Sequence, residues 1–151
     1  MEKPVRKIHS LFLSAWYPNR TDAMSGLFVR RHADAVSRFC KVSVVYVHAD
    51  SAIQRQELVI QHYNQVKEII VYYPVGRSIF GKLLKPFRYF YAFYKGIQTV
   101  FHIEGQPDIN HVNILTRTAF PALLLKYLYK IPYVVTEHWS RYLPTRNSYH
   151  G

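Results

Sequence analysis

Cysteine is almost absent from this 151-residue chain, which has only Cys40. A single thiol excludes an intramolecular disulfide framework, makes a cysteine-based metal site implausible and favours a reducing compartment. The chain also lacks any unbroken apolar stretch of the roughly 20 residues that a membrane-spanning helix needs. The apolar run near the N-terminus is interrupted by His9, Ser10 and Ser14, so we interpret it as a first strand and not as a signal peptide. Any membrane contact is therefore expected to be peripheral.

Acidic side chains are scarce: 9 Asp and Glu face 20 Lys and Arg, a formal net charge of +11. This excess predicts an acidic partner, which charge alone leaves open among nucleic acid, an anionic membrane surface and a phosphorylated ligand. The chain has neither a G-x-G-x-x-G fingerprint nor a P-loop, which argues against a dehydrogenase or a kinase. It also lacks an Asp-x-Asp pair, and its eight histidines show no tight ligand spacing, so we predict no metal site.

What the chain does contain is typical of one globular domain, with 49% hydrophobic and 16% aromatic residues. Strand-like and helix-like periods alternate, which predicts an α/β fold. We expect a Rossmann-like open, mostly parallel sheet of about five to seven strands with helices on both faces, formed by residues 1–138. Residues 139–151 are expected to be a poorly ordered tail or the start of an interdomain segment.

The predicted strands are 5–15, 41–48, 58–63, 68–74, 108–113 and 131–137, with 58–74 either a hairpin or a strand with an irregular lead-in. The predicted helices are 26–39, one beginning near Pro86, and 119–130 with Thr116 or Thr118 as its cap and Pro121 in its first turn.

The loop after the first predicted strand narrows to Ser25-Gly26 immediately before a helix. Backbone N–H groups and the positive end of the helix dipole at such a corner suit a phosphate. Glycine also lets a ligand approach the backbone closely. The plainer interpretation is that Gly26 only relieves a tight turn. We take Ser25, Gly26 and Arg30 as candidate substrate-binding residues.

Polar residues also follow two later strands, at Asn113 and at Glu137-His138. Ligands of open α/β sheets bind beyond the carboxyl ends of the strands, where we expect these loops to converge. His138 is the candidate catalytic residue because it ends a buried strand. Asn113 and Glu137 are candidate substrate-binding residues, although Glu137 points to the opposite face of its strand, where a structural or capping role is the alternative. His32 lies on the apolar face of its helix and is interpreted as a core histidine.

The stretch from residue 77 to residue 101 mixes basic and aromatic residues more densely than one core face requires. A basic amphipathic helix with an aromatic belt suits the surface of an anionic leaflet. The alternative is an ordinary helix with a solvated basic face. The candidate membrane-binding residues are Lys82, Lys85, Phe87, Arg88, Tyr91 and Lys95.

Three segments, SGLFVRRHADAV, PDINHVNILTRTAFPALLL and IPYVVTEHWS, occur in an order and spacing that together are fairly specific. They resemble the N-terminal, acceptor-side half of family 4 retaining glycosyltransferases, which have the two-domain GT-B fold. The resemblance implies transfer of a hexosyl group from a nucleotide-diphosphate sugar to a polysaccharide or glycolipid precursor, without a metal or another cofactor. It places Gly26 beside the diphosphate or the acceptor and His138 beside the transferred sugar. Many relatives have a double glycine where this chain has Ser25-Gly26.

The same resemblance implies a C-terminal, donor-binding domain that this sequence does not contain, so the chain alone is expected to be inactive. It further implies that the enzyme acts at the cytoplasmic face of a bacterial membrane on a lipid-linked or saccharide acceptor and that its partners include no nucleic acid. Two other hypotheses stay open. A basic, tyrosine-rich chain could bind single-stranded nucleic acid, although it has no recognisable motif for that, or it could be a non-catalytic membrane-associated partner subunit.

Overall fold

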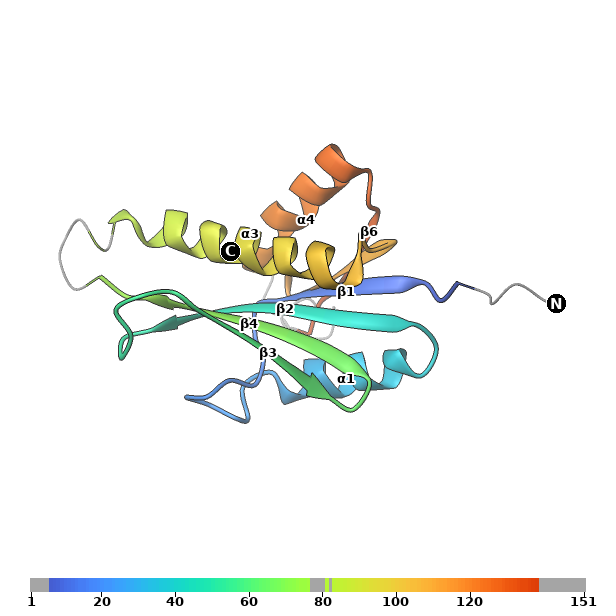
Figure 1. Ribbon diagram of the computed structural model, residues 1–151, viewed down its shortest axis with the longest axis horizontal. Coiled ribbons are helices and arrows are strands. Elements are labelled where there is room, and N and C mark those ends of the chain that lie inside the picture. The colour runs from blue at the N-terminus through green and yellow to red at the C-terminus, as the bar shows by residue number, and fades with distance from the viewer. Residues whose placement is uncertain (1–5, 77–80, 82, 139–151) are drawn as a thin grey trace, which may run out of the picture.

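The computed structural model describes residues 6–76, 81 and 83–138, so Lys82 and the predicted tail 139–151 lie outside it. Its centre is a six-stranded open sheet with the strand order β3-β4-β2-β1-β5-β6. Every neighbouring pair is parallel except the antiparallel pair of β3 and β4 at one edge. Helix α1 covers one face of the sheet, and α3 and α4 cover the other (Figure 1). The predicted α/β, Rossmann-like architecture is confirmed. The strands are β1 (His9–Ser14), β2 (Lys41–Asp50), β3 (Glu57–Tyr63), β4 (Val66–Pro74), β5 (Ile109–Asn113) and β6 (Tyr133–Thr136), and the helices are α1 (Leu27–Ser37), α3 (Lys85–Glu104) and α4 (Leu115–Tyr129).

The central strands are apolar and buried on both faces, as a parallel sheet between two helix layers requires. All of β1 is buried, and its side chains alternate between two cores. Leu11 and Leu13 pack with α3 and α4, whereas Phe12 packs with α1. In β2 the six residues 42–47 are buried without a break. The continuous β-branched run that predicted this strand therefore reflects two covered faces.

Strands β3 and β4 form an antiparallel hairpin, which settles the alternative left open for residues 58–74. Asn64 turns the chain with a φ of 52°, a conformation that asparagine tolerates better than most residues. Strand β3 is the sheet edge and alternates between exposed and half-buried residues, while β4 beside it is almost fully buried. The hairpin thus adds an antiparallel border to the parallel sheet.

Helix α3 begins at Lys85 with Pro86 in its first turn, as predicted. Gly96 brings the helix close to β2, because a Cβ atom at this position would lie 2.7 Å from Val45 Cγ1. No helix among residues 6–76, 81 and 83–138 is both long and apolar enough to cross a bilayer.

The prediction for the start of α4 was wrong. The helix begins at Leu115, so Thr116 and Thr118 lie inside it, and the Thr118 hydroxyl donates to the Ile114 carbonyl at 2.7 Å. Pro121 consequently lies within the helix and not in its first turn, where a missing N–H would cost least. The first backbone N–H of α4 is instead accepted by Glu137 Oε2 at 3.2 Å. A capping role was the alternative interpretation of Glu137, but the sequence did not indicate which helix it caps, because Glu137 follows the next strand.

The crossovers leave the sheet in opposite directions on either side of β1. The chain reaches β2 through α1 on one face, whereas it reaches β5 through α3 on the other (Figure 1). The carboxyl ends of β1 and β5 therefore meet at a topological switch point, where Ser14 pairs with Asn113 and the Ala15 N–H donates to the Asn113 carbonyl at 3.3 Å. Ligands of open α/β sheets bind at such a point.

Candidate functional site

The switch point brings together three side chains from separate elements. Asn113 ends β5, His138 follows β6, and Phe28 lies in the first turn of α1. The Nε2 atom of His138 is 3.5 Å from Asn113 Oδ1, a long hydrogen bond, and its ring lies 4.5 Å from the Phe28 ring. The predicted residues Asn113 and His138 are therefore neighbours, and Phe28 is a member of the site that the sequence did not single out.

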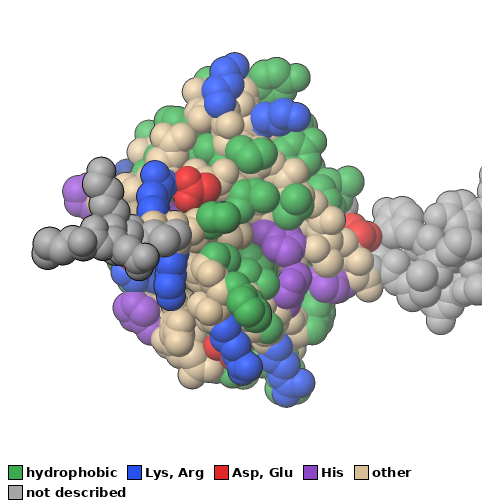
Figure 2. Space-filling view, turned by 90° about the vertical axis from the view of Figure 1, so that its right-hand side faces the viewer, with side chains coloured by type: hydrophobic (Ala, Val, Ile, Leu, Met, Phe, Trp, Pro, Cys, Tyr) green, Lys and Arg blue, Asp and Glu red, His purple; other side chains and the backbone are tan. Residues whose placement is uncertain are grey.

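Two more histidines lie beside this group. His32 of α1 and His111 of β5 have ring centroids 5.0 Å apart, and both contact the Phe12 ring. His111 also shares a hydrogen bond of 2.6 Å with the Thr136 hydroxyl. Figure 2 shows histidine side chains gathered beside hydrophobic ones on one face of the molecule. Side chains two positions apart on a strand share one face, so the sequence could have indicated that His111 lies on the same face as Asn113.

The pKa values of His32 and His111 are lowered, which favours the neutral form of both rings. Burial first, and then the neighbouring His32 and His138, lower the pKa of His111 to about 4. Burial, followed by the charge of His138, also lowers the pKa of His32. A neutral imidazole has one donor and one acceptor nitrogen, so near pH 7 these rings suit hydroxyl groups better than anions.

The backbone is strained immediately beside the site. Ile114 has φ 67° and ψ 103°, although a β-branched residue rarely adopts a positive φ. Its N–H donates to the Thr136 carbonyl at 3.1 Å, which holds the corner between β5 and α4. Strained backbone is enriched at ligand-binding sites, because only the surrounding fold can maintain it. No sequence signal could have revealed this corner.

Glu137 has the capping role that was its alternative interpretation. Besides the N–H of Leu115, its carboxylate accepts the N–H of His138, at 3.1 Å from Oε1. A carboxylate at a helix N-terminus is favoured by the helix dipole. Glu137 therefore fixes the positions of α4 and His138, and its predicted contact with substrate stays a prediction.

The predicted anion corner at Ser25-Gly26 is satisfied within the chain. The Asp22 carboxylate accepts the N–H groups of Met24 and Ser25 at 2.9 and 3.1 Å. Gly26 has a φ of 60°, and a Cβ atom there would overlap the Trp16 carbonyl. The group that approaches Gly26 closely is thus the protein's own backbone, in agreement with the plainer interpretation that Gly26 relieves a tight turn. An incoming phosphate would have to compete with Asp22.

Arg30 is likewise engaged within the fold. Its Nε and Nη2 atoms donate to the two carboxylate oxygens of Glu68 at 2.7 and 2.6 Å, and Glu68 is fully buried. Glu68 also accepts from the Tyr17 hydroxyl at 2.6 Å and from Gln61 Nε2 at 2.7 Å. Burial, followed by the charge of Glu68, raises the pKa of Tyr17. This network joins α1 to the β3–β4 hairpin, and Arg30 is not free to hold a ligand in this arrangement.

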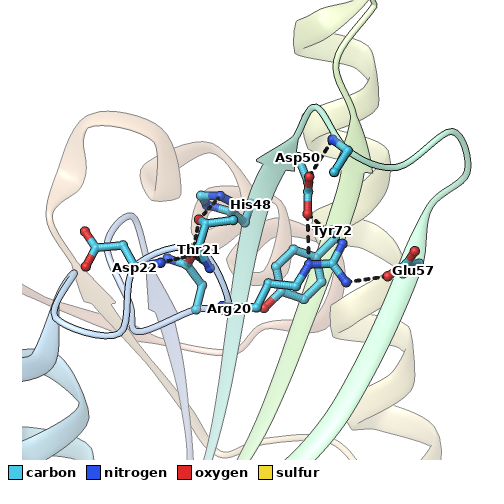
Figure 3. Close-up of polar contacts among 9 residues, drawn as sticks. Arg20, Thr21, Asp22, His48, Asp50, Glu57 and Tyr72 are labelled. Atoms are coloured by element: carbon cyan, nitrogen blue, oxygen red, sulfur yellow. Dashed lines mark hydrogen bonds and ion pairs between the residues drawn. The ribbon is translucent and has the colours of Figure 1, made fainter.

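A second network, which the sequence analysis did not anticipate, fixes the loop between β1 and α1 (Figure 3). Arg20 donates to Asp50 Oδ2 at 2.6 and 2.8 Å and to Glu57 Oε2 at 2.6 Å, and its guanidinium lies 4.0 Å from the centre of the Tyr72 ring. Beside it, Thr21 Oγ1 lies 3.0 Å from His48 Nε2. These contacts hold the loop over the carboxyl ends of β2 and β4.

No family model matches the chain. A search of the curated proteins gives no match either, so the glycosyltransferase resemblance stays a prediction. Within the part of the chain that the structure describes, no three His, Cys, Asp or Glu side chains are placed to hold a metal ion.

The candidate membrane-binding residues of α3 lie mostly at the surface. Lys85, Phe87, Tyr91 and Lys95 are exposed, with Phe87 73% exposed, and the Lys95 ammonium lies 5.6 Å from the centre of the Tyr91 ring. Arg88 is half-buried, and its Nη1 donates to the Pro74 carbonyl at 3.2 Å. Arg88 therefore ties α3 to the end of β4.

Proposed function

We propose that this chain is the acceptor-side half of a retaining, metal-independent glycosyltransferase that takes a hexose from a nucleotide-diphosphate sugar. The observation that supports the proposal most is the meeting of His138 with Asn113 and Phe28 at the switch point between β1 and β5. The strand ends indicated Asn113 and His138, the resemblance indicated His138 as well, and both residues lie at the edge where open α/β sheets bind ligands.

The chemistry of this group fits a sugar. Hydroxyl groups can both donate to and accept from an imidazole and an amide, which His138 and Asn113 supply. The ring of Phe28 offers an apolar surface beside them. In a retaining transfer the bond from the anomeric carbon to the diphosphate oxygen breaks, and a bond to the acceptor oxygen forms on the same face. The diphosphate oxygen leaves with the electron pair of the broken bond and accepts the proton of the acceptor hydroxyl.

The charge on that diphosphate needs partners, and two arginines near the predicted anion corner are already engaged within the fold. Arg20 and Arg30, two cations near the predicted anion corner in sequence, are paired with carboxylates of the chain itself. Preorganised donors at a developing charge are normally a large part of catalysis. A second, donor-binding domain would supply them, so the switch point forms one wall of an interdomain cleft.

The proposal includes peripheral attachment to the inner face of a membrane. The exposed basic and aromatic residues of α3 support it, since such residues favour the surface of an anionic leaflet. A lipid-linked acceptor would be reached from that position.

The test is a transfer assay on the protein that contains this chain together with its donor-binding domain. We expect His138→Ala to lower kcat about a hundredfold to a thousandfold, since the loss of one preorganised hydrogen-bond donor at a reacting centre typically has an effect of that order. Asn113→Ala should lower it in the same direction. His62→Ala, at an exposed position of β3, is the matched control and should leave turnover unchanged. Circular dichroism checks that each variant folds, and normal turnover by folded His138→Ala would remove His138 from the site.

A further inference from the structure

Helix α4 is apolar on its outer side as well as on the side that packs on the sheet. Phe120, Leu124, Tyr127 and Leu128 are exposed, the last two by 72% and 69%. A helix that is hydrophobic all round is normally covered on every side. The outer side of α4 therefore lacks a partner within the described residues.

A groove runs between α4 and α3. Its wider part, about 570 Å³, is bounded by Tyr73, Tyr89, Leu123 and the facing rings of Phe90 and Phe120. A narrower part of about 110 Å³ shares those two rings and continues between the two helices as far as Ile97 and Leu128. At 1.5 Å per residue, α3 spans roughly 18 Å from Lys85 to Ile97. The groove is thus long, narrow and lined mainly by apolar side chains.

One end of the groove is cationic. Lys85 and Arg117 line the wider part, and neither takes part in an ion pair among the described residues. The two helices contain one acidic residue, Glu104, which lies at the other end of α3 and pairs with Lys41 and Lys67. The groove therefore combines an apolar channel with an anion-attracting end.

We infer that this groove binds a single-chain lipid phosphate, with the hydrocarbon between α3 and α4 and the phosphate beside Lys85 and Arg117. A flat bilayer surface would cover Phe87 and Tyr127 but would not fill a hollow between two helices. A second copy of the chain on the same face would bring like charges together, because a twofold interface places the same patch against itself. The inference concerns the groove between α3 and α4 and does not depend on the proposed transfer reaction.

The experiment is a calorimetric titration of the chain with farnesyl phosphate below its critical micelle concentration. Farnesol and inorganic phosphate are titrated in parallel. We expect saturable one-to-one binding of farnesyl phosphate and binding at least tenfold weaker for each of the other two. Leu123→Ser should weaken the affinity for farnesyl phosphate and for farnesol alike. Arg117→Gln should weaken the affinity for farnesyl phosphate and leave that for farnesol unchanged.

The matched controls are Phe39→Ser and Arg38→Gln, an exposed aromatic residue and an exposed arginine after α1, which should bind like the unmodified chain. Thermal unfolding checks the fold of each variant. Equal binding by the groove variants and the controls would overturn the inference. Binding of inorganic phosphate as tight as that of farnesyl phosphate would also overturn it. The same holds if the chain attaches to vesicles but shows no saturable binding of farnesyl phosphate. It holds as well if no amphiphile binds and light scattering shows a dimer that Leu123→Ser dissociates.

Discussion

Asn110 is a buried residue whose replacement is expected to stabilise the fold. Its side chain is 0% exposed, and neither its Nδ2 nor its Oδ1 atom has a hydrogen-bond partner within the described residues. Burying an unpaired amide costs free energy that an apolar side chain of similar size avoids. We predict that Asn110→Leu raises the free energy of unfolding in urea by about 1–2 kcal/mol. Asn113→Leu on the same strand should lower it, because the Asn113 amide donates to the His111 carbonyl. A lower urea midpoint for Asn110→Leu would show that this amide is hydrogen-bonded in solution.

His111 is expected to make stability depend on pH. Its pKa is about 4 in the folded chain, chiefly through burial, against about 6.5 for an unperturbed histidine. Between these values the unfolded state binds the proton and the folded state does not, so the free energy of unfolding falls as the pH drops from 6.5 towards 4. Because the ring is only partly buried, we expect His111 to contribute about 1–2 kcal/mol of this loss.

The measurement is urea denaturation at pH 7.0 and pH 4.5 for the unmodified chain and for His111→Gln. The variant should lose less stability on acidification, since it removes the ring that resists protonation. His102→Gln, at the exposed end of α3, is the control and should keep the full pH dependence. The same loss in His111→Gln as in the unmodified chain would show that other groups cause it.

At the scale of elements, one buried ion pair joins α1 to the hairpin. Removing Arg30 would leave the fully buried Glu68 without its cation, and a broken buried pair typically costs about 3–5 kcal/mol. We predict that Arg30→Ala lowers the free energy of unfolding by about 3 kcal/mol. Arg31→Ala, the exposed neighbour on the same helix, should change it by less than about 0.5 kcal/mol. Similar losses for the two variants in urea denaturation would show that the pair contributes little.

Helix α3 contains Gly96, a residue of low helix propensity that its close contact with the sheet requires. Alanine is favoured over glycine in an isolated helix by about 1 kcal/mol. Yet a Cβ atom at Gly96 would press against Val45 in the sheet, and overpacking typically costs 1–3 kcal/mol. We therefore predict a lower thermal midpoint for Gly96→Ala. Thr99→Ala in the same helix gains helical propensity at a half-buried position and serves as the control. A higher midpoint for Gly96→Ala would mean that the helix can move away from β2.

Local sequence patterns predicted the elements well and their ends less well. The apolar run of β2 and the proline at the start of α3 act through neighbours in sequence, so these features could be predicted. The cap of α4 by Glu137 and the carboxylate of Asp22 in the predicted anion corner depend on where the fold places a side chain. Arg30 shows the same limit, since its partner Glu68 lies 38 positions away. The strand ends correctly indicated Asn113 and His138 as neighbours, because parallel strands share one edge.

Across the whole molecule, the acidic residues are largely used in pairs and leave one surface basic. Asp50, Glu57, Glu68, Glu104 and Asp108 each bind a lysine or an arginine. The outer sides of α3 and α4 carry exposed lysines and aromatic residues together, and the only acid in these helices is Glu104. These two helices therefore combine basic side chains with exposed apolar surface, a combination that suits an anionic bilayer better than water alone.

This asymmetry predicts attachment to anionic vesicles through α3. A lysine near an anionic surface adds about 1 kcal/mol, so Lys85→Ala and Lys95→Ala should each weaken binding about fivefold. The measurement is co-sedimentation with phosphatidylcholine vesicles that contain phosphatidylglycerol, at low and at high salt, because screening should reduce the effect. Arg31→Ala and Arg38→Ala test the opposite side of the molecule, where both residues are exposed. If the variants on both sides weaken vesicle binding equally, the attraction comes from the total charge. If the α3 variants bind vesicles as well as the unmodified chain does, α3 is not part of the contact. Tight binding of single-stranded RNA at physiological salt, with no binding to vesicles, would favour the nucleic-acid hypothesis instead.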